Sequence, residues 1–312
     1  MTLHRVVVGS SAADLRLMAQ AVGNAQLGRL YTGGTTVDEM RAATAALLAH
    51  PLVRKPLPGV AVSAAELGGV PGEWVGRPPR PGDPIALFLP GGGYVRGGLA
   101  LGRIDASELA HLADAPVFNL AYRQAPEHRF PAAFDDVVSA YEALLATGFD
   151  TGKILLVGES AGAGLALALA MHTRDQRKPV PAGVVAISAL VDMTMSGASW
   201  HEHAAGDLVT RAMGEQLLAL YMANGDRRDP RASPAFGRFE GLPPLMLHTG
   251  GAELLLSDVE ALAERAALAA VEVSHCIYGG MPHGFTKFNI DAASVVIGHA
   301  ARALKALRGN PG

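Results

Sequence analysis

Short apolar runs of strand length recur along the chain from residue 85 onward, separated for the most part by helix-length stretches. The runs lack the alternation of apolar and polar residues that a half-exposed strand shows, so we expect both faces of each strand to be covered. This pattern is typical of a parallel sheet flanked by helices, an α/β fold. The predicted strands are Ile85–Leu89, Ala115–Leu120, Ile154–Val157, Gly183–Ile187 and Leu245–Thr249.

Before these runs, GVAVSAAEL and VPGEWV are separated by Gly68-Gly69. Two glycines suit the positive φ angles of a tight hairpin turn, so the sheet is predicted to start with an antiparallel pair.

The longer stretches between and after the predicted strands have the spacing of apolar residues that is typical of helices. The predicted helices are Ile104–Ala113, Phe134–Ala146, Ala161–Thr173, Arg211–Met222, Ser257–Ala269 and Ala292–Leu307.

Two segments do not follow the rhythm of strands and helices. One is the first 50 or so residues, which include an amphipathic stretch, Val37–Ala49; the other is the region of about residues 192–231. Long insertions of this kind are commonly functional. We expect one domain over residues 1–312, with both segments forming a helical cap over the carboxyl ends of the strands.

Composition narrows the classes of function. With 49% hydrophobic and 18% charged residues over 312 positions, the chain can bury a large core. A net charge of -3 without a run of Lys or Arg gives no reason to expect nucleic acid or membrane insertion. The N-terminus has neither the pattern of a signal peptide nor that of a membrane anchor, which predicts a cytoplasmic protein. Cys276 is the only cysteine, so no intrachain disulfide forms, and a buried thiol is expected there.

The strongest local motif is Gly158-Glu159-Ser160-Ala161-Gly162, which follows an apolar strand and leads directly into a helix. A G-x-S-x-G turn in this context holds the serine in a strained conformation with its hydroxyl exposed. Glycines two positions to either side avoid clashes between the strand and the helix. Ser160 is therefore predicted to be a nucleophile.

A serine nucleophile needs a histidine base, and the histidine needs a carboxylate. In enzymes with such an elbow, the acid and then the histidine follow the serine along the chain. His283, in YGGMPHGF, fits this order. After the strand Leu245–Thr249, Glu253 and Asp258 are both candidate acids; Glu253 is favoured because it follows the strand end more closely. His201 and His203 are interpreted as cap residues, because HxH without a third ligand is a weak metal motif.

Three consecutive glycines, Gly91 to Gly93, follow the strand Ile85–Leu89. Glycines let backbone N–H groups turn toward a substrate, so this loop is a candidate oxyanion hole. A phosphate-binding loop is the alternative, but the chain has neither GxxxxGK[ST] nor a nearby dinucleotide-binding acid.

Taken together, the motifs GGVPGEWV, GGGYVRGG, AYRQAPEHRFPAAFDD, GESAGAGLALALA, DPRASPAF, GLPPL and GMPHGF resemble those of the bacterial hormone-sensitive-lipase-like esterases. This α/β-hydrolase family includes carboxylesterases and monoterpene lactone hydrolases. The resemblance implies an α/β-hydrolase fold with Ser160 as nucleophile and His283 as base. It also implies that Gly92, Gly93 and Ala161 donate the oxyanion hydrogen bonds.

The chain departs from the family pattern at four positions. Pro90 stands where the family usually has histidine, Ala121 where it has aspartate before Tyr-Arg, and Glu159 where the elbow usually has aspartate. Ala252 replaces the first residue of an Asp-Glu pair, which leaves Glu253 as the candidate acid in that loop. The loss of histidine at Pro90 removes a side chain expected to brace the glycine loop.

These features predict a serine carboxylesterase that hydrolyses small, fairly apolar esters without a metal or organic cofactor. A lactone hydrolase or an acyltransferase would use the same residues. A non-catalytic or weakly active binding protein on the same scaffold is the alternative of another class, because fold does not fix function. The expected partner is a small ester or lactone, and a homodimer is compatible with the sequence.

Overall fold

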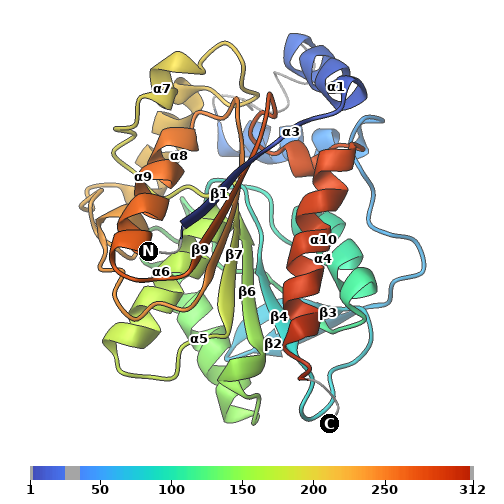
Figure 1. Cartoon of the computed structure of the whole chain (residues 1–312), viewed down its shortest axis with the longest axis vertical. Helices are drawn as coiled ribbons and strands as arrows, with labels where there is room; N and C mark the ends of the chain where they lie inside the picture. The colour runs from blue at the N-terminus through green and yellow to red at the C-terminus, as the bar shows by residue number, and fades with distance from the viewer. Residues whose placement is uncertain (1–2, 25–35, 310–312) are drawn as a thin grey trace.

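The computed structural model describes residues 3–24 and 36–309, which form an α/β protein around one nine-stranded sheet (Figure 1). The strand order is β1-β9-β8-β7-β6-β4-β5-β3-β2. The strands are β1 (Leu3–Val8), β2 (Val62–Leu67), β3 (Val70–Val75), β4 (Ile85–Leu89), β5 (Val117–Leu120), β6 (Ile154–Glu159), β7 (Gly183–Ile187), β8 (Leu245–Gly250) and β9 (Val273–Tyr278).

The sheet is parallel from β1 through β5 in spatial order, after which β3 pairs antiparallel with β5 and β2 pairs antiparallel with β3. The antiparallel pair is the predicted hairpin, whose turn residues Gly68 and Gly69 have φ angles of 59° and 79°. The central strands β4, β6 and β7 are buried at every residue, as their continuous apolar composition predicts. The fold class predicted from the sequence is confirmed.

Helices cover both faces of the sheet (Figure 1): α4 and α10 lie on one side, and α5, α6 and α9 lie on the other. The helices are α1 (Ala12–Gly23), α3 (Val37–Ala49), α4 (Leu99–Ala113), α5 (Ala132–Ala146), α6 (Ala161–Asp175), α7 (Ser199–Glu202), α8 (Arg211–Met222), α9 (Leu256–Leu268) and α10 (Asp291–Ala306), with 3₁₀ turns at Thr151–Lys153, Pro234–Phe236 and Phe285–Lys287. No helix within residues 3–24 and 36–309 is long and apolar enough to cross a membrane.

The predicted elements agree closely with those observed. Helices α3 and α8 have the predicted bounds; α3 begins at a capping box in which Thr36 and Glu39 exchange hydrogen bonds. Helix α4 begins at Leu99, five residues earlier than Ile104, after Gly98 with a φ of 82°. Cys276 is buried in β9, as expected.

The prediction that the whole of the first 50 residues lies outside the sheet is wrong for Leu3–Val8. These residues form the edge strand β1, which pairs in parallel with β9. Its sequence, LHRVVV, carries a histidine and an arginine and is mostly exposed, so it lacks the apolar continuity of the inner strands. Residues 1–2 and 25–35 of the predicted cap lie outside the described residues.

Candidate active site

Ser160 lies at the sharp turn between β6 and α6, with φ 54° and ψ −118°. A non-glycine residue in this conformation is strained, and the surrounding backbone holds it there: the N–H of Ser160 donates to the carbonyl of Ile187 at 2.8 Å. A Cβ at Gly158 would lie 2.4 Å from the Gly162 oxygen, and one at Gly162 would lie 1.9 Å from the Leu89 oxygen. Both glycines are therefore required by close backbone approach, as the motif predicts.

His283 lies in the loop after β9 and reaches both Ser160 and Glu253. Its Nε2 is 3.0 Å from the Ser160 Oγ, and its Nδ1 is 3.3 Å from Glu253 Oε2. With the proton on Nδ1 facing the carboxylate, Nε2 can accept the proton of the Ser160 hydroxyl. The structure thus brings together three residues that are 123 and 30 positions apart.

Glu253 is fully buried and is held in place by two further donors. The Ser188 hydroxyl and the Gly250 N–H each donate to its Oε1 at 2.6 Å, which leaves Oε2 for His283. Asp258, the other candidate acid, instead accepts a hydrogen bond from the Trp200 indole at 2.7 Å. Nothing in the sequence around Ser188 marked it as a partner of the acid, because the contact forms between the ends of β7 and β8.

Three carboxylates set the charge around His283. Burial lowers the pKa of His283, but the hydrogen bond to Glu253 and the charges of Glu253, Asp207 and Glu159 outweigh burial and hold this pKa above its ordinary value. For Asp207, burial raises the pKa to about 6 against the opposing charge of His283. The imidazole is therefore surrounded by negative potential, which stabilises the imidazolium that forms when it takes a proton.

Glu159, next to the nucleophile, belongs to a buried ion cluster. Lys287 Nζ lies 2.6 Å from Glu159 Oε2 and also pairs with Asp105, which in turn pairs with Arg54. Burial raises the pKa of Glu159, and Lys287 opposes that rise. The two carboxylates hold the pKa of Lys287 above its usual value despite burial, so the ammonium stays charged. No local motif marks Lys287, since its partners Glu159 and Asp105 come from β6 and α4.

The glycine loop after β4 adopts conformations that glycine alone takes readily: φ is 129° at Gly92 and 62° at Gly93. A Cβ at Gly92 would lie 1.8 Å from the Arg96 oxygen. Within the described part of the chain, the N–H groups of Gly92, Gly93 and Ala161 donate no backbone hydrogen bond. Because they lack a backbone acceptor, these N–H groups are candidate donors to a substrate.

Pro90, which stands where the family usually has histidine, accepts a hydrogen bond through its carbonyl oxygen. The Tyr122 hydroxyl donates to the Pro90 oxygen at 2.6 Å, and burial raises the pKa of Tyr122, so this phenol stays protonated. The same segment of chain holds the rest of the glycine loop, because Gln124 Nε2 donates to the Arg96 oxygen and the Ala125 N–H donates to the Tyr94 oxygen. Since Tyr122 contacts the backbone, this support does not depend on the side chain at position 90.

A pocket of about 110 Å³ lies beside Ser160, and its lining is mostly apolar. Thr44 and Leu47 of α3 contribute to one part of the wall. The segment of residues 192–231 contributes another, through Trp200, Met213 and Leu217 among others. Both segments predicted to form a cap therefore have residues in the pocket wall.

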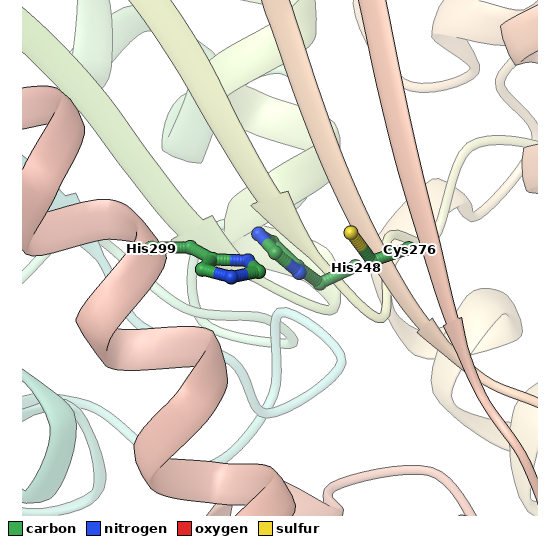
Figure 2. A group of neighbouring side chains, drawn as sticks. All are labelled: His248, Cys276 and His299. Atoms are coloured by element: carbon green, nitrogen blue, oxygen red, sulfur yellow. The ribbon is translucent and has the colours of Figure 1, made fainter. Parts of the chain in front are cut away.

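One other group of side chains has the composition of a metal site. His248, Cys276 and His299 lie between the sheet and α10, and one ligand atom from each lies within 4.8 Å of the others (Figure 2). Burial lowers the pKa of His248 to about 3, so its ring is neutral, and the Nδ1 is 3.0 Å from the Tyr278 hydroxyl. None of these side chains contacts Ser160 or His283 through a hydrogen bond in the described residues.

Of the two cap histidines, His203 contacts the loop that carries Glu253, with Nδ1 2.9 Å from the Glu253 carbonyl oxygen.

Comparison with known proteins gives a consistent set of similarities. A sequence profile described as alpha/beta hydrolase fold matches residues 86–287. An "Acetyl-hydrolase" of Streptomyces hygroscopicus is 42% identical over 205 residues, which cover 65% of this chain and 68% of the relative. An "Esterase" of Acinetobacter venetianus is 32% identical over 234 residues, 74% and 77% of the two chains. An "Ethyl acetate hydrolase" of Pseudomonas putida is 33% identical over 223 residues, 68% and 70%.

Solved structures match nearly the whole chain. An esterase from the bacterial hormone-sensitive lipase family superposes with a TM-score of 0.86 at 33% identity, covering 96% of this chain and 100% of the other. A hormone-sensitive-lipase homologue from a metagenome library gives a TM-score of 0.83 at 33% identity, covering 94% and 97%.

Proposed function

Because the chain belongs to the α/β-hydrolase family, in its bacterial hormone-sensitive-lipase branch, we propose that it is a serine carboxylesterase acting through an acyl-enzyme. The observation that carries the proposal is the continuous hydrogen-bonded series Ser160–His283–Glu253 at the wall of a pocket. A nucleophile, a base and an acid that orients the base are what acyl transfer requires.

In this reaction His283 Nε2 takes the hydroxyl proton as Ser160 Oγ attacks the ester carbonyl carbon. The resulting oxyanion accepts hydrogen bonds from the N–H groups of Gly92, Gly93 and Ala161. His283 then returns the proton to the departing alkoxide, which leaves the acyl group on Ser160. Water, deprotonated by the same histidine, attacks the acyl-enzyme and releases the acid. The available N–H groups and the negative surroundings of His283 support these steps.

The substrate is a small, fairly apolar acyl ester. The mostly apolar pocket of about 110 Å³ supports a short acyl group, and the names of two relatives, an acetyl-hydrolase and an ethyl acetate hydrolase, are consistent with a short acyl group. The cap consists of α3 and residues 192–231, since both reach the pocket wall, while residues 3–8 belong to the sheet.

Labelling with a fluorophosphonate probe tests the nucleophile. The wild-type protein is expected to take the probe and Ser160→Ala to lose it, with both proteins equally folded by circular dichroism. A protein that never takes the probe would be a binding protein rather than a hydrolase. Labelling that persists in Ser160→Ala would assign the nucleophile elsewhere.

A panel of p-nitrophenyl acetate, butyrate, octanoate and palmitate, with simple lactones beside it, tests the substrate class. We expect kcat/KM to be highest for acetate or butyrate and to fall with chain length. Preference for lactones would favour the lactone hydrolase. Probe labelling without hydrolysis of any panel member, but with transfer to an added alcohol, would favour the acyltransferase.

A further inference from the structure

Asp207 connects the cap to both loops that carry the acid and the base. It lies between α7 and α8, within the cap segment of residues 192–231, and its side chain is buried. Its Oδ1 accepts the N–H of His283 at 2.7 Å, and its Oδ2 accepts the N–H of Leu254 at 2.7 Å. Leu254 directly follows Glu253, so one carboxylate holds the backbone of the base and the backbone next to the acid.

The position of these two loops decides whether the catalytic contact forms. The Nδ1 of His283 and Oε2 of Glu253 are 3.3 Å apart, the longer of the two contacts in the series, and a small shift of either loop would break it. The hydrogen bonds that Asp207 accepts from these loops come from backbone N–H groups, so the side chains of His283 and Glu253 can face each other. A third N–H, that of Leu208, fixes the Asp207 carboxylate itself.

A second cap residue reaches the same place. His203 Nδ1 lies 2.9 Å from the carbonyl of Glu253, so the cap contacts both polar groups of the peptide bond between Glu253 and Leu254. Asp207 does not line the pocket, whereas its neighbours Val209 and Thr210 do. The cap segment therefore touches the substrate space with some residues and the acid–base pair with others.

From this geometry, and on the premise of the proposed esterase function, we infer that Asp207 is a positioning residue by which the cap sets the relation of His283 to Glu253. The charged groups that face His283 are Glu253 from the loop after β8, Asp207 from the cap, and Glu159 from β6, which is paired with Lys287. Loss of the Asp207 charge removes one of the three negative groups. A neutral side chain that only filled this space would leave the titration of His283 unchanged. The charge of Asp207, by contrast, raises the pKa of His283.

The test compares Asp207→Asn with Glu215→Gln in the full chain. Asparagine keeps the size of Asp207 but is neutral and cannot accept through its NH₂ group. Glu215 is a matched control, because it lies on α8 in the same cap segment, pairs with Arg227 and is only half-buried. The two measurements are the titration of the His283 imidazole by NMR and steady-state hydrolysis of p-nitrophenyl acetate.

For Asp207→Asn we expect the His283 midpoint to fall by about 0.5–1 pH unit, since one anionic neighbour is lost. We expect kcat to fall about 10- to 100-fold through misalignment, with KM within about twofold of wild type. Glu215→Gln is expected to match wild type in both measurements. If Asp207→Asn does not fold, Asp207→Ser, which is also neutral, gives the same comparison.

An unshifted His283 midpoint in the neutral variant, with or without a loss of kcat, would overturn the inference, and so would an equal effect of Glu215→Gln. The imidazole titration needs no turnover. A wild-type protein that hydrolyses none of the esters would therefore refute the proposed esterase function. The effect of Asp207 on the titration of His283 could still be measured in that case.

Discussion

The acid–base loops after β8 and β9 differ from the glycine loop after β4 in what holds them together. The former are joined by carboxyl groups: Glu253 and Asp207 are buried, and they hydrogen-bond the side chain and the backbone of His283, respectively. The latter is held by backbone conformation and neutral hydrogen bonds, with Gly92 at a positive φ and Tyr122 on the Pro90 carbonyl. Substitutions on the first side should therefore leave a signature in pH dependence, and substitutions on the second should not.

The largest effect is expected for Glu253→Gln. Glutamine keeps the shape but cannot stabilise a protonated His283, and its NH₂ group can leave the ring in the wrong tautomer. We expect kcat to fall by about 10³–10⁴. Asp258→Asn is the control, because Asp258 bonds Trp200 and not His283. Loss of turnover in Asp258→Asn, with turnover retained in Glu253→Gln, would assign the acid to Asp258.

Gly92→Ala should have the next largest effect. Its Cβ would lie 1.8 Å from the Arg96 oxygen, so the loop must move and the nearby N–H groups lose their aim. Loss of one oxyanion donor costs about 10²–10³ in kcat. Gly82→Ala is a matched control, since Gly82 also has a positive φ, 83°, but open space around it. We expect Gly82→Ala to lose stability alone; equal losses of kcat in the two variants would show that backbone strain, not the oxyanion loop, is responsible.

The pH dependence of kcat/KM distinguishes substitutions in the loops after β8 and β9 from substitutions in the glycine loop. As the proposed base, His283 can take a proton only when it is neutral, and its pKa lies above the ordinary 6.5. Activity should therefore rise with pH to a midpoint above 6.5, and fall about tenfold for each unit well below it. Gly92→Ala should lower the whole profile and leave the midpoint in place. A wild-type midpoint below 6.5 would mean that burial outweighs the three carboxylates.

Tyr122→Phe tests the brace of the glycine loop with a smaller change. It removes the hydroxyl that donates to the Pro90 oxygen at 2.6 Å and leaves a buried carbonyl without that partner. We expect a loss of about 1–3 kcal/mol in the free energy of unfolding and a decrease of a few-fold in kcat. Denaturant unfolding and p-nitrophenyl acetate hydrolysis measure the two. An unchanged stability would show that this hydrogen bond does not hold the loop.

The smallest effect is expected for Pro90→His, which restores the residue usual in the family. Tyr122 bonds a carbonyl that any residue at position 90 offers, and a Cβ on Gly102 would already lie 3.0 Å from the Pro90 ring. We therefore expect a change in kcat/KM within about fivefold, through repacking of the larger ring. Unchanged kcat/KM and substrate range would show that Pro90 has no role of its own.

Much of the molecule follows from local sequence. Continuous apolar runs specify buried strands such as Ile85–Leu89 and Gly183–Ile187, whose predicted bounds are those observed. The turn at Ser160 was also predictable, because close backbone atoms require its two glycines. Gly158 approaches the Gly162 oxygen four residues along the chain, and Gly162 approaches the Leu89 oxygen at the end of the adjacent strand. Glu253 was favoured by its closeness to the end of β8, and the structure places it beside His283.

The remaining features depend on contacts between distant segments. The edge strand Leu3–Val8 is recognisable only through β9, since one side of an edge strand faces water and needs no apolar pattern. Ser188, Asp207 and Lys287 are ordinary polar residues in the sequence, and each acquires its place from partners dozens of residues away. Local composition thus determined most of the strands and helices and the strained turn at Ser160. Tertiary structure alone decided which buried charges surround the base, because burial and short distances give those charges their strength.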